Sequence, residues 1–326
     1  MAGAAERFAT FAALHVPGDP VVLYNVWDVG SALAVIAAGA KALATGSHPV
    51  ADANGFADGQ GVPLDFALDN ARRIVAATDL PVSVDFEGAY AVDPREGGAN
   101  MKRLAETGAI GCNFEDQIIG GEGLHPLDLQ ARRIAAARAA VGDAFFINAR
   151  TDAFLKVKPD QHDAALADQA IERGKAFADA GASGFFIPRL GDLALVERIV
   201  AAVPLPVNAI AYPGAPSKAE WASAGIARIS HGPFPHKALM AQLTEAAKAA
   251  IDGGRNQYPP GPGVPELLDA ISAHQSRFYG LDVDPRSEVL VTVGATEAIA
   301  ATILALCEPG DEVVTFEPYY DSYAAS

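Results

Sequence analysis

The most constraining feature of the sequence is a regular alternation of short apolar segments with longer alanine-rich segments between about residues 20 and 250. The short segments are rich in β-branched and aromatic residues, as strands are, whereas the longer ones repeat apolar residues with a helical period. We predict strands at residues 21–27, 41–47, 81–87, 110–116, 145–151, 184–189, 206–212 and 227–231. We predict helices at residues 64–78, 95–107, 127–141, 162–180, 193–203, 217–224 and 235–251. Eight alternations of this kind favour the α/β class and a parallel (β/α)8 TIM barrel.

An open, doubly wound sheet is the alternative to a barrel, because it uses the same alternation of strands and helices. Its glycine-rich phosphate-binding turn is missing after the first predicted strand. Glycines do occur where several predicted helices should stop, as expected for residues that end a helix in the left-handed conformation. These glycines are Gly108, Gly142, Gly181 and Gly225.

The composition excludes several classes of partner. The chain has 326 residues, with 24 Lys and Arg against 40 Asp and Glu, and therefore a formal net charge of −16. Because so acidic a surface repels phosphate backbones, we expect no nucleic-acid partner. The two cysteines, Cys112 and Cys307, lack metal-ligand spacing and fit a reducing compartment. We find neither a secretory signal nor a run of about 20 apolar residues, and so expect a cytoplasmic protein without a membrane partner.

Polar side chains gather at the predicted carboxyl ends of the strands, which is where barrel enzymes have their active sites. From the first strand to the eighth they are Asp28, Thr45 to Ser47, Asp85 and Glu87, Glu115 and Asp116, Arg150 and Asp152, Arg189, Asn208 and His231. Each one taken singly has an alternative role as a helix cap or loop residue. Together they predict one active-site rim.

Three carboxylates on neighbouring strands, Asp85, Glu87 and Glu115, predict a metal site. Asp85 and Glu87 are two residues apart, so in a strand their side chains point to the same face. Crowded carboxylates repel one another, so the arrangement requires a divalent cation or a raised pKa. Oxygen ligands without His or Cys suit Mg²⁺ or Mn²⁺. Arg150 on the next strand is suited to clamp the carboxylate of a small acid. The alternatives are that the carboxylates belong to capped loops and salt bridges, and that Arg150 is a partner for Asp116 or Asp152.

Several motifs resemble those of the isocitrate lyase/phosphoenolpyruvate mutase superfamily over about three-quarters of the chain. They are residues 25–28 (NVWD), 45–47 (TGS), 55–59 (GFADG), 84–87 (VDFE), 111–116 (GCNFED) and 148–152 (NARTD). The resemblance implies a barrel over residues 1–251 and cleavage or rearrangement of a C–C or P–C bond next to a keto-acid carbon. It also implies a homo-oligomer, a dimer or a tetramer, whose subunits exchange a C-terminal helix.

The same resemblance implies roles for the predicted site residues. Asp85 matches the residue that contacts Mg²⁺, and Asp58, Glu87 and Glu115 match residues that hold its water ligands. Ser47 and its neighbouring amides match the site of the substrate carboxylate, and Arg150 matches the residue at the other end of the substrate. The predicted substrate-binding residues are Trp27, Thr45, Gly46, Ser47, Arg150 and Asn208.

Departures from the family pattern narrow the chemistry. Residues 117–125 lack the catalytic cysteine of isocitrate and methylisocitrate lyases, Asn113 replaces their histidine, and the mutase gating loop is missing. We therefore expect an Mg²⁺-dependent lyase or hydrolase that cleaves a C–C bond of an oxaloacetate-like acid through a metal-stabilised enolate, with P–C cleavage less favoured. Besides Arg150, the predicted catalytic residues are His231 and His125, with His236 a further candidate, since imidazole titrates near neutrality. A non-catalytic module that binds metal and keto acid is the alternative.

The composition changes after residue 251. Residues 252–265 are rich in Gly and Pro and are predicted to form a linker. An α/β appendage is predicted beyond it, with helices at 266–279 and 296–306 and strands at 289–293 and 312–316. Because a lone strand–helix–strand unit lacks neighbours that complete a sheet, we expect residues 266–326 to pack loosely, or to lean on the barrel or on another subunit.

This C-terminal segment resembles the start of a fold-type I aminotransferase, a family that uses pyridoxal phosphate. The resemblance covers residues 255–326 and rests on residues 257–263, 294–298 and 317–321. It includes no match to the lysine that forms the Schiff base, so we expect neither bound pyridoxal phosphate nor transamination by these residues. The alternative is a pyridoxal-phosphate protein in which a second chain supplies the lysine.

Overall fold

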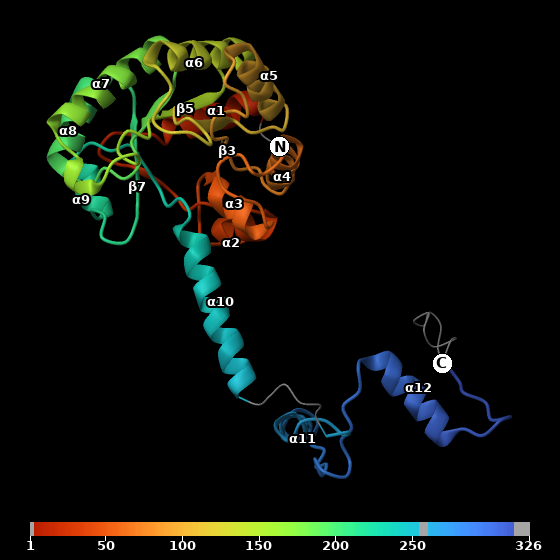
Figure 1. The fold of residues 1–326 in the computed structure, drawn as a ribbon. Coiled ribbons are helices and arrows are strands. Elements are labelled where there is room, and N and C mark those ends of the chain that lie inside the picture. Colours follow the sequence, from red (N-terminus) through yellow and green to blue (C-terminus); the bar gives the residue numbers. More distant parts are fainter. Residues whose placement is uncertain (1–2, 254–259, 316–326) are drawn as a thin grey trace. The chain divides into compact units, whose positions relative to one another are not determined.

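The computed structural model describes residues 3–253 and 260–315, which are coloured by sequence in Figure 1. Contacts within the chain define two compact units, residues 1–243 and 244–326. The division falls inside helix α10 (Phe234–Asp252), whereas the sequence predicts that the barrel domain ends at residue 251. The first unit contains the barrel, and the second contains the C-terminal tail.

The first unit is built on one parallel sheet that curls around an axis (Figure 1). Its strands are β1 (Val21–Leu23), β2 (Leu43–Ala44), β3 (Val82–Asp85), β4 (Gly111–Glu115), β5 (Phe146–Arg150), β6 (Gly184–Phe186), β7 (Val207–Ile210) and β8 (Arg228–Ser230). They pair in the order β1-β8-β7-β6-β5-β4-β3-β2. A parallel bridge between Val26 and Thr45 links the chain after β1 to the chain after β2 and closes the ring. The predicted TIM barrel is confirmed.

Helices connect the strands around the outside of the barrel. They are α2 (Val29–Ala37), α3 (Ser47–Ala53), α4 (Leu64–Ala76), α5 (Pro94–Ala105), α6 (Leu127–Val141), α7 (Ala164–Asp179), α8 (Leu193–Ala202) and α9 (Lys218–Ser223), with a 3₁₀ turn at Pro159–Gln161. Aspartates cap several of them: Asp163 accepts a hydrogen bond from the Leu166 amide, and Asp192 accepts one from the Leu195 amide. All four glycines predicted to end helices have φ between +70° and +94°. Among the described residues, no helix is long and apolar enough to cross a membrane.

A short N-terminal helix, α1 (Ala4–Ala13), packs against the residues that begin the strands. Its buried Phe11 forms a small apolar cluster with Leu23, Ile110 and Phe146. His15 lies 4.3 Å from the Phe146 ring in a stacked arrangement, and its Nδ1 lies 2.8 Å from the Phe11 carbonyl oxygen. Since this cluster closes the amino-terminal end of the barrel, ligands have access from the opposite end.

The strands are shorter than predicted, and three helices, α1, α2 and α3, were not predicted. β1 ends at Leu23 and α2 begins at Val29, and β2 ends at Ala44 before α3 begins at Ser47. The prediction extended each strand into the polar rim, because apolar character continues past the last ladder hydrogen bond. Strand β3 likewise ends at Asp85 and does not reach Glu87.

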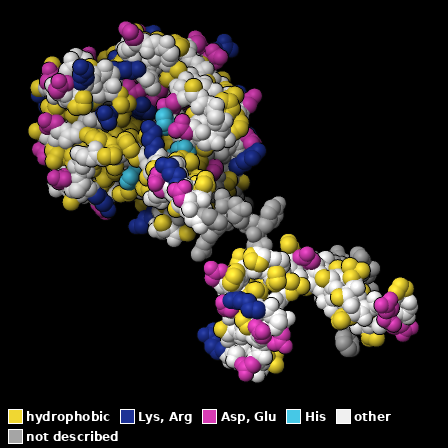
Figure 2. Space-filling view, turned by 60° about the horizontal axis from the view of Figure 1, so that its bottom comes forward, with side chains coloured by type: hydrophobic (Ala, Val, Ile, Leu, Met, Phe, Trp, Pro, Cys, Tyr) yellow, Lys and Arg dark blue, Asp and Glu magenta, His cyan; other side chains and the backbone are white. Residues whose placement is uncertain are grey.

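In the described part of the tail the structure contains the two predicted helices, α11 (Pro265–Tyr279) and α12 (Ala295–Leu306). The predictions of strands at 289–293 and 312–315 are wrong, because these residues pair with no strand; Phe316 lies outside the described residues. Val293 and Val314 are 92% and 84% exposed, and apolar side chains are visible on the surface of this unit (Figure 2). Residues with a preference for the strand conformation form no ladder of hydrogen bonds unless a neighbouring strand pairs with them.

Candidate active site

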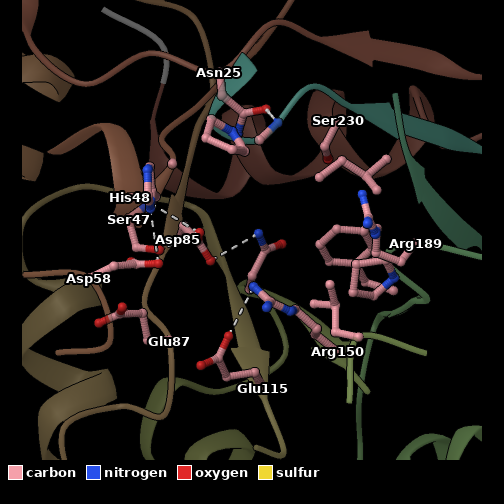
Figure 3. A pocket seen from close by; sticks show the side chains of 18 of the residues that line it. Asn25, Ser47, His48, Asp58, Asp85, Glu87, Glu115, Arg150, Arg189 and Ser230 are labelled. Carbon is pink, nitrogen blue, oxygen red and sulfur yellow. Dashed lines mark hydrogen bonds and ion pairs between the residues drawn. The ribbon is translucent and has the colours of Figure 1, made fainter. Parts of the chain in front are cut away.

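A cavity of about 380 Å³ lies at the carboxyl ends of the barrel strands (Figure 3). Its lining includes the last residue of six strands: Asp85 of β3, Glu115 of β4, Arg150 of β5, Phe186 of β6, Ile210 of β7 and Ser230 of β8. The start of α3 adds Ser47 and His48. Because parallel strands of a barrel end at one rim, side chains that are far apart in the sequence meet here.

Asp85 is held in a fixed orientation on both of its oxygens. Oδ2 accepts hydrogen bonds from the backbone N and Oγ of Ser47, at 3.1 and 3.0 Å, and Oδ1 accepts one from Asn113 Nδ2 at 3.2 Å. Asn113 is itself held, because its Oδ1 accepts from Asn148 Nδ2 at 2.8 Å and from the buried guanidinium of Arg228 at 3.3 Å. A chain of polar contacts therefore runs from the barrel interior to Asp85.

Glu87 enters the cavity from a turn rather than from a strand. Its φ of +49° is left-handed, so the prediction that Asp85 and Glu87 share one strand face is wrong, although both line the cavity. The Glu87 carboxylate accepts hydrogen bonds from the amides of Gly59 and Gln60, at 3.1 and 2.8 Å. The pKa of Glu87 is raised to about 7, chiefly by burial and also by the negative charges of Asp85 and Asp58, although the two amides oppose the rise.

Arg150 is anchored by two carboxylates and keeps donors for a third. Its Nη1 lies 2.9 Å from Glu115 Oε2, and its Nε and Nη2 lie 2.6 and 3.1 Å from the oxygens of Asp152. These contacts use three of the five N–H groups of a guanidinium, so two N–H groups remain for a ligand. Asp116 is not a partner of Arg150, because it pairs with Arg173 at 3.0 Å.

The pKa values of Glu115 and Arg150 are both raised, for different reasons. Burial raises the pKa of Glu115 to about 8, although the positive charge of Arg150 opposes the rise. Burial lowers the pKa of Arg150, but the charges of Asp152, Glu115 and Asp85 outweigh that effect and hold it above its usual range. The guanidinium is therefore a permanent cation at the cavity wall.

The cavity fits a Mg²⁺-type ion held mainly through water. Among the described residues, no three His, Cys, Asp or Glu side chains are arranged as a direct metal cage. Mg²⁺ usually keeps several water ligands and takes only one or two carboxylates from the protein. Asp85 supplies one fixed carboxylate, and the charge repulsion among Asp85, Asp58 and Glu87 is of the kind that a cation relieves. The donor set is all oxygen, which suits Mg²⁺ or Mn²⁺.

The structure brings together most of the predicted polar rim but not all of it. The predicted residues that line the cavity are Gly46, Ser47, Asp58, Asp85, Glu87, Glu115, Arg150 and Arg189. Trp27, Thr45 and Asn208, predicted to bind substrate, do not line it. Thr45 is buried and accepts a hydrogen bond from the Asp85 amide, and Asn208 is buried against Ser230. Trp27 packs edge-on against His236, 4.8 Å away.

The histidines predicted as proton donors also lie outside the cavity lining. His231 stands against the Tyr24 ring at 4.9 Å, and its Nδ1 is buried without a hydrogen-bond partner. His125 is buried, and its backbone bonds to Asp116 and Arg173. Strand position alone did not reveal that these residues lie outside the cavity lining.

Several lining residues were not predicted as site residues. His48 lies 3.1 Å from Asp58 through Nδ1 and 3.1 Å from Asp52 through Nε2, and so fixes the position of Asp58. The feature of the sequence that could have indicated His48 as a site residue is its position next to Ser47. Gln117, Tyr212 and Lys237 also line the cavity.

The barrel and its carboxylate-rich cavity define a member of the phosphoenolpyruvate phosphomutase family, whose family model matches residues 11–251, and the chain belongs to this family. A solved structure described as a putative phosphonomutase from Burkholderia cenocepacia is 45% identical, with a TM-score of 0.73, and covers 77% of this chain and 100% of its own. The probable 2-methylisocitrate lyase 2 of Corynebacterium glutamicum is 37% identical over 147 residues, which are 43% of this chain and 45% of that protein.

A second family model, aminotransferase class I and II, matches residues 228–326. The probable N-succinyldiaminopimelate aminotransferase DapC of Mycobacterium tuberculosis is 54% identical over 100 residues, which are 31% of this chain. The matched region spans a quarter of the length of that aminotransferase. Both resemblances inferred from the motifs are thus confirmed.

Proposed function

We propose that this chain is an Mg²⁺-dependent lyase or hydrolase that cleaves a C–C bond of a small keto or dicarboxylic acid of the oxaloacetate type. One observation carries the proposal. In a single cavity, the fixed carboxylate of Asp85 stands with the guanidinium of Arg150, which keeps two N–H groups for a ligand. An acid with a carbonyl next to its carboxylate has the groups that such a pair recognises.

Asp85 would hold the cation, and Asp58, Glu87 and Glu115 would accept hydrogen bonds from its water ligands. When bound, the cation polarises the carbonyl of the acid and offsets the negative charge that develops as the adjacent bond breaks. Arg150 orients an anionic group of the substrate, and its own position is set by Glu115 and Asp152. Because Arg150 is pre-positioned, little reorganisation is needed as that charge develops.

C–C cleavage is favoured over P–C cleavage because the mutase gating loop is missing from the sequence. The name of the 45% identical structure, a putative phosphonomutase, makes phosphonopyruvate the natural comparison substrate. Catalytic roles for His231 and His125 stay predictions, and they require motion of rings that do not line the cavity.

The proposal is tested by incubating the full chain with oxaloacetate, its alkylated derivatives, isocitrate and phosphonopyruvate. Pyruvate and oxalate are measured by coupled assay and chromatography, before and after EDTA treatment and with Mg²⁺ restored. A protein-free sample with Mg²⁺ corrects for the spontaneous decarboxylation of oxaloacetate. We expect metal-dependent turnover of at least one acid that disappears in Asp85→Asn and persists in Arg132→Met, a change at an exposed helix position.

Turnover of none of these acids above the protein-free rate would contradict the proposal. Tight binding without product would instead favour the non-catalytic module. A yellow protein with an aldimine absorption band would favour a pyridoxal-phosphate protein.

We further propose that the protein is a cytoplasmic homo-oligomer that acts on a small-molecule substrate. Cys112 and Cys307 form no disulfide, which supports a reducing location.

A further inference from the structure

Arg189 occupies a strained backbone position at the edge of the cavity. It follows β6 by three residues, and its φ of +73° is in the left-handed region. That conformation is costly for a residue with a side chain, and it persists where the surrounding structure imposes it, often at functional sites. The left-handed backbone of Arg189 therefore points to a functional role for its side chain.

The Arg189 guanidinium lines the cavity without a protein counter-ion. It lies over the ring of Tyr212, 5.4 Å from the ring centroid, and no carboxylate of the described residues is within ion-pair distance. Asp192 and Glu220 line a second hollow that Arg189 also borders. Both are occupied elsewhere, because Asp192 accepts from the Leu195 amide and Glu220 accepts from the Ser217 amide.

Apolar surface separates Arg189 from the carboxylate end of the cavity. Phe186, Pro188 and Ile210 line the same cavity. In Figure 3, Arg189 lies on the far side of the pocket from Asp58, Asp85 and Glu87. The cavity therefore has a polar end with Asp85 and Arg150, an apolar wall, and a second cation.

We propose that Arg189 is a specificity-determining residue that binds a second, distal anionic group of the substrate. This inference rests on the proposed function and narrows its substrate class to acids with two anionic ends joined by a short alkyl segment. Stacking on Tyr212 holds the guanidinium plane, so that its N–H edge is available to a carboxylate. Lys237 is the competing cation, because it also lines the cavity and has no ion pair among the described residues.

Matched pairs of 2-oxo acids isolate the distal group. 2-Oxoglutarate and 2-oxopentanoate differ only in a terminal carboxylate against a methyl group, and 2-oxoadipate and 2-oxohexanoate repeat the comparison one carbon longer. Binding of all four, and of oxalate, is measured by calorimetry with Mg²⁺ for the full-length wild type and for Arg189→Met, Lys237→Met and Arg132→Met. Oxalate is too short to reach a distal anchor, so it reports whether each variant keeps the metal end intact.

We expect the diacid of at least one pair to bind the wild type about tenfold more tightly than its methyl partner, which is the contribution of one hydrogen-bonded charge. That preference should fall to about one in Arg189→Met, while oxalate binding stays unchanged, and it should persist in Lys237→Met and Arg132→Met. A preference that survives in Arg189→Met, or that Lys237→Met removes instead, would overturn the assignment. Oxalate binding without any diacid preference would refute this inference alone, whereas loss of all binding in the wild type would refute the proposed function as well.

Discussion

His15 makes the barrel sensitive to acid, and this sensitivity is large enough to measure. The ring is 8% exposed, stacked on Phe146, and near the positive charge of Arg228. Burial and that charge lower the pKa of His15 to about 3, from 6.5 in an unfolded chain. Between these two values the unfolded state binds more protons than the folded state, so stability rises with pH in this window and is lost as the pH falls below 6.5.

The size of the effect follows from the two pKa values. At pH 5.0 the unfolded state gains about 2 kcal/mol from protonation of this one histidine, and at pH 7.5 it gains almost nothing. His15→Phe keeps an aromatic ring against Phe146 and removes the titration. The variant should therefore lose about 2 kcal/mol less free energy of unfolding than the wild type between pH 7.5 and 5.0.

The assay is urea unfolding followed by tryptophan fluorescence at the two pH values. Trp27 and Trp221 are the two tryptophans of the chain and both are buried in the barrel unit, so the signal reports barrel unfolding. His274→Phe, at an exposed position in the tail, is the matched control and should leave the pH dependence unchanged. An equal loss of stability in His15→Phe and in the wild type would refute the assigned protonation state.

Other substitutions test the site and the packing. Arg150→Lys keeps the charge but loses the planar fork shared with Asp152, so kcat/KM should fall about 10- to 100-fold with little change in unfolding free energy; an unchanged kcat/KM would argue against its role as a clamp. Gly111→Ala places a Cβ 2.6 Å from the Phe146 carbonyl oxygen and should destabilise the barrel by about 1–3 kcal/mol in the same urea titration. Gly30→Ala, whose Cβ meets only an ordinary contact, should be neutral within about 1 kcal/mol.

The barrel was predictable from the sequence because its determinants are local and repeated. Every strand except β2 contains β-branched or aromatic residues, and the helix-ending glycines mark where the chain turns back. The convergence of Asp85, Glu115 and Arg150 was also predictable, since parallel barrel strands end at one rim. Glu87 reached the cavity for a reason that the sequence did not reveal, a left-handed turn after β3.

Side-chain direction near the rim was not predictable. Asn208 lies in β7 and Thr45 directly follows β2, but they are buried beside Ser230 and Asp85, respectively, rather than in the cavity. His231 turns toward Tyr24 because that ring offers an aromatic surface. His48 was missed because it belongs to the first turn of α3 and not to a strand end.

The tail shows the limit of local propensity. Residues 289–293 have the composition of a strand, yet a strand needs a partner, and the described residues around them provide none. Helices α11 and α12 form because their hydrogen bonds are internal to each segment.

The most direct test of the central claim is calorimetric titration of oxalate into the full chain, with and without Mg²⁺, and into Asp85→Asn. Oxalate has the paired oxygens of the charge-developed substrate and reacts no further. The arrangement of Asp85 and Arg150 predicts binding that requires Mg²⁺ and is lost in Asp85→Asn. Binding that is equally strong without the metal, or that survives in Asp85→Asn, would contradict the account.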